Sequence, residues 1–327
     1  MALSPNEVPK IFGDVPAFMG LPYLPKVDRQ TALDAVIVGM PYDGIATFRG
    51  GATRRAPQEI RKYSLLFGSY HLDWDMSALD HVAVADCGDV DVVAGDTPES
   101  YRRLEERLRA ILAARAVPMM LGGDHGVTYP AVKAVAAAAG GPLGFLLFDT
   151  HLDLSESFNG DRLTRASPVL RICELPEIDP RRMAIIGPKG PRNLPEWPPL
   201  ARDLGITIYP DRVVQTRGIE AVVREALGVV SPDGRPPYVS VDIDVIDPAF
   251  APGTNSIEPG GFTSREIING VRLGCENGFC GFDVVEVSPD YDSRTGHTST
   301  LAARLVVEAI CCLAARKADK VRAWDRR

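Results

Sequence analysis

Short, almost uninterrupted apolar segments alternate with amphipathic helical patterns along this 327-residue chain. Segments such as AVIVGM (35–40), VPMMLGG (117–123) and LGFLLFD (143–149) lack the strict polar–apolar alternation of a sheet with one solvated face. Strands that are apolar on both faces are typical of parallel sheets covered by helices on each side. The sequence therefore predicts a three-layer α/β/α fold with a central, mostly parallel sheet. We also expect strands at 182–187, 205–209, 238–247 and 279–287, and helices at 100–116, 128–140, 219–230, 264–277 and 298–318.

The domain organisation predicted from the sequence is simple. No repeat or low-complexity tract divides the chain, and predicted strands flank the proline-rich stretch 187–200, which we interpret as a loop. We expect an N-terminal arm over residues 1–30 and a single α/β domain over residues 31–327.

Composition excludes several classes of partner. The formal net charge is −7 and the pI is about 5.4, so the basic footprint of a nucleic-acid-binding protein is absent. The first residues do not have the pattern of a signal peptide, and the longest uninterrupted apolar runs are far shorter than a membrane span. None of the six cysteines forms a CxxC pair. We therefore expect a protein of the reducing cytoplasm, with no membrane or nucleic-acid partner.

Acidic and histidine residues follow directly after three of the predicted strands. The carboxyl ends of parallel strands meet at one edge of a sheet, so these groups can converge although they are distant in sequence. Three of these residues also have a simpler interpretation: Asp124 as a helix cap, His125 as a loop residue and Asp247 before Pro248 as a turn former. The three groups are Asp124 and His125; Asp149, His151 and Asp153; and Asp242, Asp244 and Asp247.

The paired aspartates are the strongest indication of a metal site. Each pair places like charges at the end of a buried strand with no lysine or arginine in the same segment, and each unpartnered carboxylate costs several kcal/mol. Four carboxylates and two imidazoles without a thiolate suit Mn(II), with Ni(II) next and Co(II) or Fe(II) as alternatives. Two ions about 3.5–4 Å apart accommodate such a set better than one ion, and they activate water for hydrolysis.

The spacing of the middle group predicts a bend. In an extended strand Asp149 and Asp153 would lie about 13 Å apart, which is too far for two neighbouring ions. We therefore expect the strand to end near Asp149 and the backbone to turn by Asp153.

Four segments together resemble the ureohydrolases, the arginase/agmatinase family: GGDHGVTYP (122–130), FDTHLD (148–153), SVDIDVIDPAFAPGT (240–254) and DVVEVSPDYD (283–292). The segments GMPYDG, APQEIR and DCGDV are similar to the agmatinase-like branch in particular. The resemblance extends over about residues 34–315 and implies an arginase-like fold and a trimeric or hexameric homo-oligomer. It also implies that a hydroxide bridging two metal ions attacks the guanidinium carbon of the substrate. The metal ligands that the resemblance implies are His125, Asp149, His151, Asp153, Asp242 and Asp244.

The resemblance further assigns roles around these ligands. Glu286 is expected to bind the substrate guanidinium, with an ordinary buried salt bridge as the alternative interpretation. We also expect Asp153 to hold and relay the proton of the hydroxide besides binding metal. Arg165, in TRASP (164–168), stands where the family usually has a histidine that shuttles protons, and arginine cannot act as an acid near neutral pH. His297 is a candidate replacement, with an exposed loop histidine as the alternative interpretation. Substrate contacts are expected from Glu286, Arg165, Asn255 and Ser155.

The sequence thus predicts a hydrolase that cleaves a C–N bond of a guanidino compound, releasing urea or a urea-like product and an amine. Agmatine, a guanidino acid, guanidine and a biguanide remain open as substrates. The alternative is a non-catalytic or impaired subunit of a hetero-oligomer, which the intact ligand set disfavours. A phosphate-handling protein is disfavoured because no glycine-rich phosphate loop is present.

Overall fold

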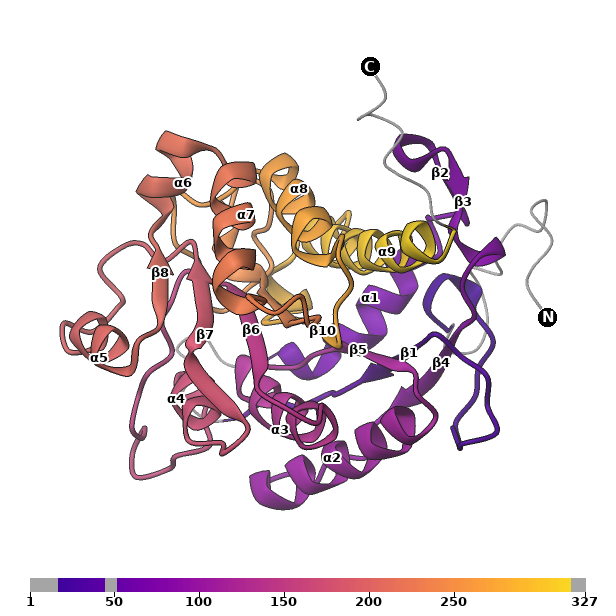
Figure 1. Ribbon diagram of the computed structural model, residues 1–327, viewed down its shortest axis with the longest axis horizontal. Coiled ribbons are helices and arrows are strands. Elements are labelled where there is room, and N and C mark those ends of the chain that lie inside the picture. The colour runs from indigo at the N-terminus through magenta and orange to yellow at the C-terminus, as the bar shows by residue number, and fades with distance from the viewer. Residues whose placement is uncertain (1–16, 45–51, 319–327) are drawn as a thin grey trace.

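The central feature of the fold is a sheet of eight parallel strands (Figure 1). The computed structural model describes residues 17–44 and 52–318, and all strand pairs of this sheet within those residues are parallel. This confirms the predicted parallel architecture. In spatial order the strands are β4 (Val84–Asp89), β1 (Ala35–Gly39), β5 (Val117–Leu121), β10 (Gly281–Val285), β9 (Tyr238–Asp242), β6 (Leu143–Phe148), β7 (Ile178–Ile186) and β8 (Thr207–Tyr209).

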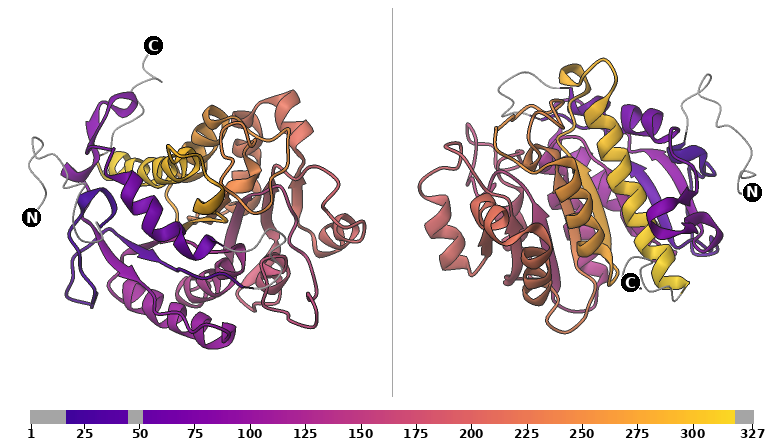
Figure 2. Two further views of the ribbon diagram at one scale, coloured as in Figure 1. Left: turned by 180° about the vertical axis from the view of Figure 1, so that it is seen from behind. Right: turned by 90° about the horizontal axis from the view of Figure 1, so that it is seen from above.

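Helices cover both faces of the sheet, as the two further views show (Figure 2). The helices of each face bury an apolar core against the sheet. One face carries α1 (Ala56–Ser64), α7 (Ile219–Val230), α8 (Ser264–Cys275) and α9 (His297–Lys317), with α6 (Asp211–Arg217) packed against α7. The other face carries α2 (Thr97–Ala113), α3 (Thr128–Ala138), α4 (Pro168–Cys173) and α5 (Trp197–Leu204). Because each strand packs against a helix layer on both sides, its apolar side chains are buried in either direction, which confirms the three-layer α/β/α class.

The strand order gathers the predicted ligands at the centre of the sheet. From β1 the chain adds β4 on one side and β5 on the other, and from β6 it adds β7 and β8 outward. The last two strands, β9 and β10, then fill the gap between β5 and β6. The four central strands β5, β10, β9 and β6 therefore end side by side, which is where ligands bind in open α/β sheets.

The ends of β6 and β9 are followed by turns that position residues of the site. The predicted bend after Phe148 is confirmed, because β6 ends there and Asp153 has a φ of 48°. The expected strand over 238–247 was wrong in its second half: β9 ends at Asp242 and a 3₁₀ turn follows over Ile243–Val245. The Asp242 carboxylate accepts a hydrogen bond from the Asp244 backbone N–H (2.8 Å), which bends the chain at this point.

The N-terminal segment packs on the domain where the structure describes it. Residues 1–16 of the predicted arm lie outside the described residues, whereas Phe18 and Met19 are buried in the core and Tyr23 pairs with Asp86 of β4. Near the other terminus, α9 is long and apolar enough to span a membrane by composition. However, 83% of its apolar window is buried inside the protein, so α9 is a core helix.

Candidate metal centre

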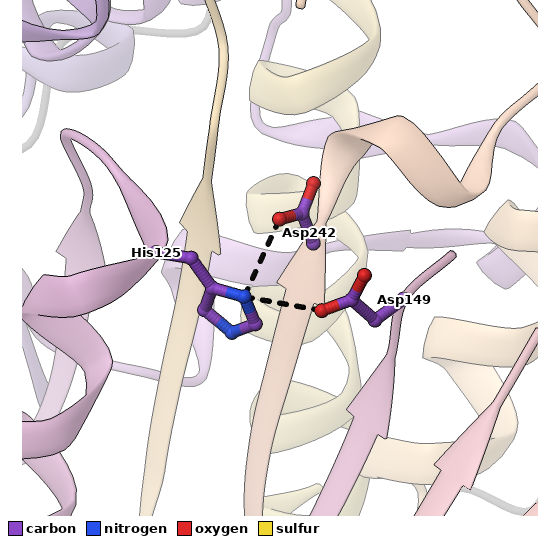
Figure 3. Close-up of side chains that lie close together, drawn as sticks. All are labelled: His125, Asp149 and Asp242. Atoms are coloured by element: carbon purple, nitrogen blue, oxygen red, sulfur yellow. Dashed lines mark ion pairs between the residues drawn. The ribbon is translucent and has the colours of Figure 1, made fainter. Parts of the chain in front are cut away.

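Side chains from three neighbouring strands converge into two overlapping ligand groups. His125, Asp149 and Asp242 offer ligand atoms that all lie within 4.8 Å of one another, and Asp149, His151 and Asp244 form a second group by the same measure. Figure 3 shows the first group: His125 follows β5, Asp149 follows β6 and Asp242 ends β9. Asp149 belongs to both groups, so its two oxygens can serve two ions.

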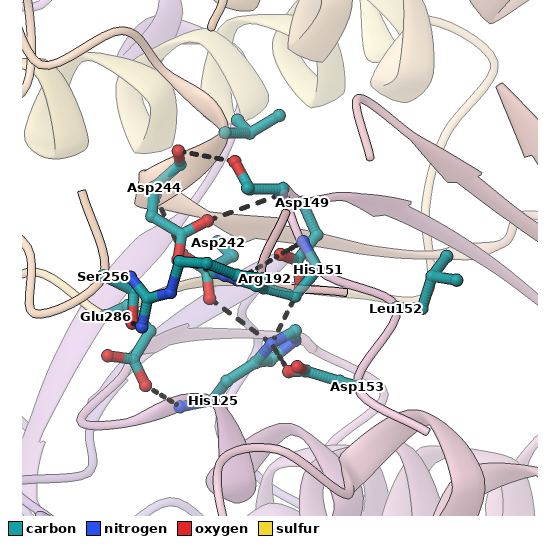
Figure 4. Close-up of polar contacts among 12 residues, drawn as sticks. His125, Asp149, His151, Leu152, Asp153, Arg192, Asp242, Asp244, Ser256 and Glu286 are labelled. Carbon is teal, nitrogen blue, oxygen red and sulfur yellow. Dashed lines mark hydrogen bonds and ion pairs between the residues drawn. The ribbon is translucent and has the colours of Figure 1, made fainter. Parts of the chain in front are cut away.

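Local turns bring residues two positions apart to the same place. The Asp149 carboxylate accepts a hydrogen bond from the His151 backbone N–H (2.6 Å), as Asp242 does from Asp244. The left-handed backbone at Asp153 then returns its carboxylate to the first group, where Asp153 Oδ2 lies 2.8 Å from His125 Nδ1. All six predicted ligands therefore lie together (Figure 4).

Burial makes this cluster electrostatically unfavourable without a cation. Burial raises the pKa of Asp242 well above its usual value and raises that of Asp153 to about 6, and neighbouring aspartates add to both shifts. Burial also disfavours the charged form of Asp149, yet His125 and His151 lower its pKa to about 2. For the two histidines, Asp149 and a second aspartate outweigh burial and raise the imidazole pKa well above its usual range.

Several buried atoms of the cluster lack hydrogen bonds. Neither ring nitrogen of His125 nor Asp149 Oδ2 has a hydrogen-bond partner among the described residues, although Nδ1 lies 3.1 Å from that oxygen. Buried polar atoms of this kind normally find a partner. Divalent cations would satisfy these atoms and offset the like charges of the carboxylates, so the residues present fit a metal centre.

Glu286 borders the ligand groups and is held by two donors. It follows β10 with a φ of 62°, and its Oε1 accepts a hydrogen bond from the His125 backbone N–H (2.8 Å). Its Oε2 accepts from Arg165 Nη1 (2.8 Å), whose Nη2 donates to Asp43 Oδ1 (2.9 Å) and lies 3.5 Å from Asp124. Burial raises the pKa of Glu286 to about 7, although Arg165 opposes this shift.

The remaining predicted site residues lie farther from these contacts. Asn255 is buried and its Oδ1 accepts a hydrogen bond from Ser288, two residues after Glu286. Ser155 is half-buried, and its backbone N–H donates to the carbonyl of Ala166, next to Arg165. His297 is exposed at the first residue of α9 and belongs to neither ligand group of the described residues.

Sequence reasoning did not foresee the contacts of two acidic residues with Arg165. Asp43, the second acidic partner of Arg165, lies in GMPYDG, a segment noted only for its family resemblance. Asp124 was grouped with His125, with a helix cap as its simpler interpretation, and it does accept a hydrogen bond from the Gly126 backbone N–H (3.0 Å). It also accepts from the Gly44 N–H (2.6 Å) and faces Arg165. The signal for Asp43 was present, but only a contact across the fold gives it a role.

Comparison with known proteins identifies the family. The model of the Arginase family matches residues 33–312. This chain belongs to the arginase family. It is an agmatinase-like member, as the sequence motifs predicted, and a hydrolase that acts on C–N bonds of linear amidines.

Individual relatives in the arginase family agree with this assignment. The chain is 38% identical to guanidinopropionase of Pseudomonas aeruginosa over 95% of each sequence. It is 36% identical to a mitochondrial agmatinase of Gallus gallus, over 89% of this chain and 84% of the relative. Among solved structures, proclavaminate amidino hydrolase of Streptomyces clavuligerus superposes with a TM-score of 0.85 at 35% identity. That match covers 93% of this chain and 98% of that chain.

Proposed function

We propose that this arginase-family protein is a binuclear-metal hydrolase that attacks the guanidinium carbon of a small guanidino compound. The observation that carries the proposal is the pair of ligand groups that share Asp149, with Glu286 bordering them. Two divalent ions, Mn(II) first and Ni(II) next, would be held by the six predicted ligands. When bound, such ions lower the pKa of water and supply hydroxide near neutral pH.

The protein's own residues have separate roles in this proposal. Each oxygen of Glu286 accepts one hydrogen bond in the structure and keeps lone pairs for N–H groups of a substrate guanidinium. Arg165 orients that carboxylate and favours its anionic form, so we propose Arg165 as a positioning residue. Asp153, next to His125, is proposed to hold and relay a proton. Proton donation by His297 and substrate contacts by Asn255 and Ser155 stay predictions.

The relatives support the substrate class. Guanidinopropionase and agmatinase are named for guanidino substrates of different charge, so a guanidino compound is the shared feature. Agmatine, a guanidino acid, guanidine and a biguanide all contain the carbon that the proposal requires. We further propose a homo-oligomer, trimeric or hexameric, located in the cytoplasm, where the six unpaired cysteines would stay reduced.

The alternative of a non-catalytic subunit predicts a different behaviour of the purified chain. Such a subunit would release no product without a second chain. Turnover would then require the hetero-oligomer that this chain forms with a catalytic partner chain. The buried, complete ligand set favours the catalytic interpretation, because unpaired buried carboxylates are costly to retain.

Metal analysis combined with a substrate panel tests the proposal. The purified chain should bind about two equivalents of Mn(II) or Ni(II). Asp149→Asn should lose both ions because Asp149 belongs to both groups, and His151→Asn should retain one. Asp247→Asn is the matched control, because Asp247 accepts hydrogen bonds from the backbone N–H groups of Ala249 and Gly260 and belongs to neither ligand group.

The panel decides between enzyme and subunit. The metal-loaded chain alone should release urea and an amine from at least one guanidino compound. Glu286→Gln should keep its metal and lose about 10²–10³-fold in kcat/KM, as expected for a lost electrostatic contact. Absence of turnover with every compound and every metal would refute the proposal and favour the subunit.

A further inference from the structure

The loop after β7 contacts the segment that carries His151, whose side chain is 13% exposed and is the most exposed of the six ligands. We call this solvent-facing side of the metal centre the opening. Asn193 Oδ1 accepts a hydrogen bond from the Leu152 backbone N–H (2.9 Å), and its Nδ2 donates to the Thr150 carbonyl (2.9 Å). Asn193 therefore binds the backbone on both sides of His151. This double contact fixes the position of the neighbouring residue, Arg192, beside the second ligand group.

Arg192 reaches from this side of the opening to the other. Its Nη2 lies 3.4 Å from Ser256 Oγ, in the loop after β9. The adjacent Asn255 contacts Ser288, which follows Glu286 by two residues. In Figure 4 the Arg192 side chain crosses in front of the ligand groups, with its guanidinium toward Ser256 on the side of Glu286. A cation thus lies between the His151 side and the Glu286 side of the opening.

The charges around this opening are unevenly distributed. Inside, the carboxylates of Glu286, Asp43 and Asp124 surround the guanidinium of Arg165, and that of Asp43 also lies 3.5 Å from exposed Arg54. At the rim, Arg192 is exposed, and no acidic side chain of the described residues forms an ion pair with it. A substrate with a cationic head and an anionic tail matches both ends, whereas a second cationic group would meet like charge at the rim.

We propose that Arg192 is a specificity-determining residue that binds a carboxylate at the far end of the substrate. The substrate class is then a guanidino acid, with its guanidinium on Glu286 and its carboxylate on Arg192. The guanidinium fork of arginine suits a carboxylate through two parallel hydrogen bonds. This inference rests on the proposed function, because it assumes that a guanidino compound occupies the metal centre.

Three compounds of matched chain length separate the effect of the tail from that of the head: 4-guanidinobutyrate, butylguanidine and agmatine. With metal-loaded protein, kcat/KM for the acid should exceed that for butylguanidine by about tenfold or more, with agmatine lowest. Arg192→Gln should remove most of the preference for the acid and change kcat/KM for butylguanidine by less than about twofold. Arg192→Glu should make agmatine the better substrate.

A binding measurement provides a readout without turnover. In metal-free protein, 4-guanidinobutyrate should raise the melting temperature more than butylguanidine does, and Arg192→Gln should abolish this difference. Arg202→Gln is the matched control, because exposed Arg202 lines a neighbouring cavity of about 710 Å³ that borders Leu152 and Asn193 and has neither Arg192 nor a metal ligand in its lining. This control should leave both measurements unchanged.

The outcomes distinguish the inference from the function on which it rests. If wild-type protein hydrolyses no guanidino compound, both are wrong. If it hydrolyses one but prefers agmatine, or if Arg192→Gln lowers kcat/KM for all three compounds equally, only the role of Arg192 is refuted. A change in tail preference with Arg202→Gln instead would place the carboxylate in the neighbouring cavity and would also overturn the inference.

Discussion

Replacing Arg165 by methionine tests the buried charge network at its centre. The Arg165 side chain is 8% exposed, and its partners Glu286 and Asp43 are 3% and 6% exposed. Removing one partner of a buried ion pair costs about 3–5 kcal/mol, because the remaining charges keep their desolvation penalty. At about 2.1 cal/mol/K per residue, the 327 residues give an unfolding entropy of about 0.7 kcal/mol/K. Arg165→Met should therefore lower the melting temperature by about 4–7 °C.

Scanning calorimetry on chelator-treated protein measures this shift without a contribution from bound metal. Arg181→Met is the matched control, because Arg181 pairs with Asp179 at 2.9 Å but its side chain is 78% exposed. An exposed pair contributes about 0–1 kcal/mol, so the control should shift the melting temperature by less than about 2 °C. Equal shifts in the two variants would show that the Arg165 network does not stabilise the fold, and the argument from buried charge would fail.

Three further changes have defined outcomes. Burial disfavours the charged form of Glu308, but His71, Arg272 and Arg304 outweigh burial and lower the pKa of this carboxyl. Glu308→Gln should therefore cost about 3–5 kcal/mol in urea unfolding at pH 7, a difference that shrinks as pH falls below about 4. A Cβ on Gly187, whose φ is 109°, would meet Val245 at 2.4 Å, so Gly187→Ala should lower stability by about 1–3 kcal/mol more than Gly218→Ala, where no atom lies within 4 Å. Removal of the metal by a chelator should lower the melting temperature by about 4 °C for each ion whose free concentration was about 100 times its Kd before chelation. A flat difference across pH for Glu308→Gln, equal losses for the two glycine variants, or no chelator effect would contradict the respective argument.

Much of the fold could be predicted because its determinants are local. Apolar segments such as 143–149 need burial on both faces, and only a sheet between two helix layers provides it. The bend at Asp153 was predictable too, since fixed strand geometry sets the spacing of Asp149 and Asp153. The strand over 238–247 was overextended because alternating polar and apolar residues also fit a strand followed by a 3₁₀ turn, which the Asp242 carboxylate stabilises.

The layer architecture, the chemical type of the ligands and the family could all be read from the sequence, because these depend on residue type and spacing within single segments. Which side chains meet depends on the packing of distant segments. Arg165 and Glu286 are 121 residues apart, and their ion pair exists because β9 and β10 insert between β5 and β6. Arg192 likewise gained significance only when Asn193 placed it across the opening from Ser256. Strand order and contacts between loops depend on the packing of the whole chain, so no local pattern specifies them.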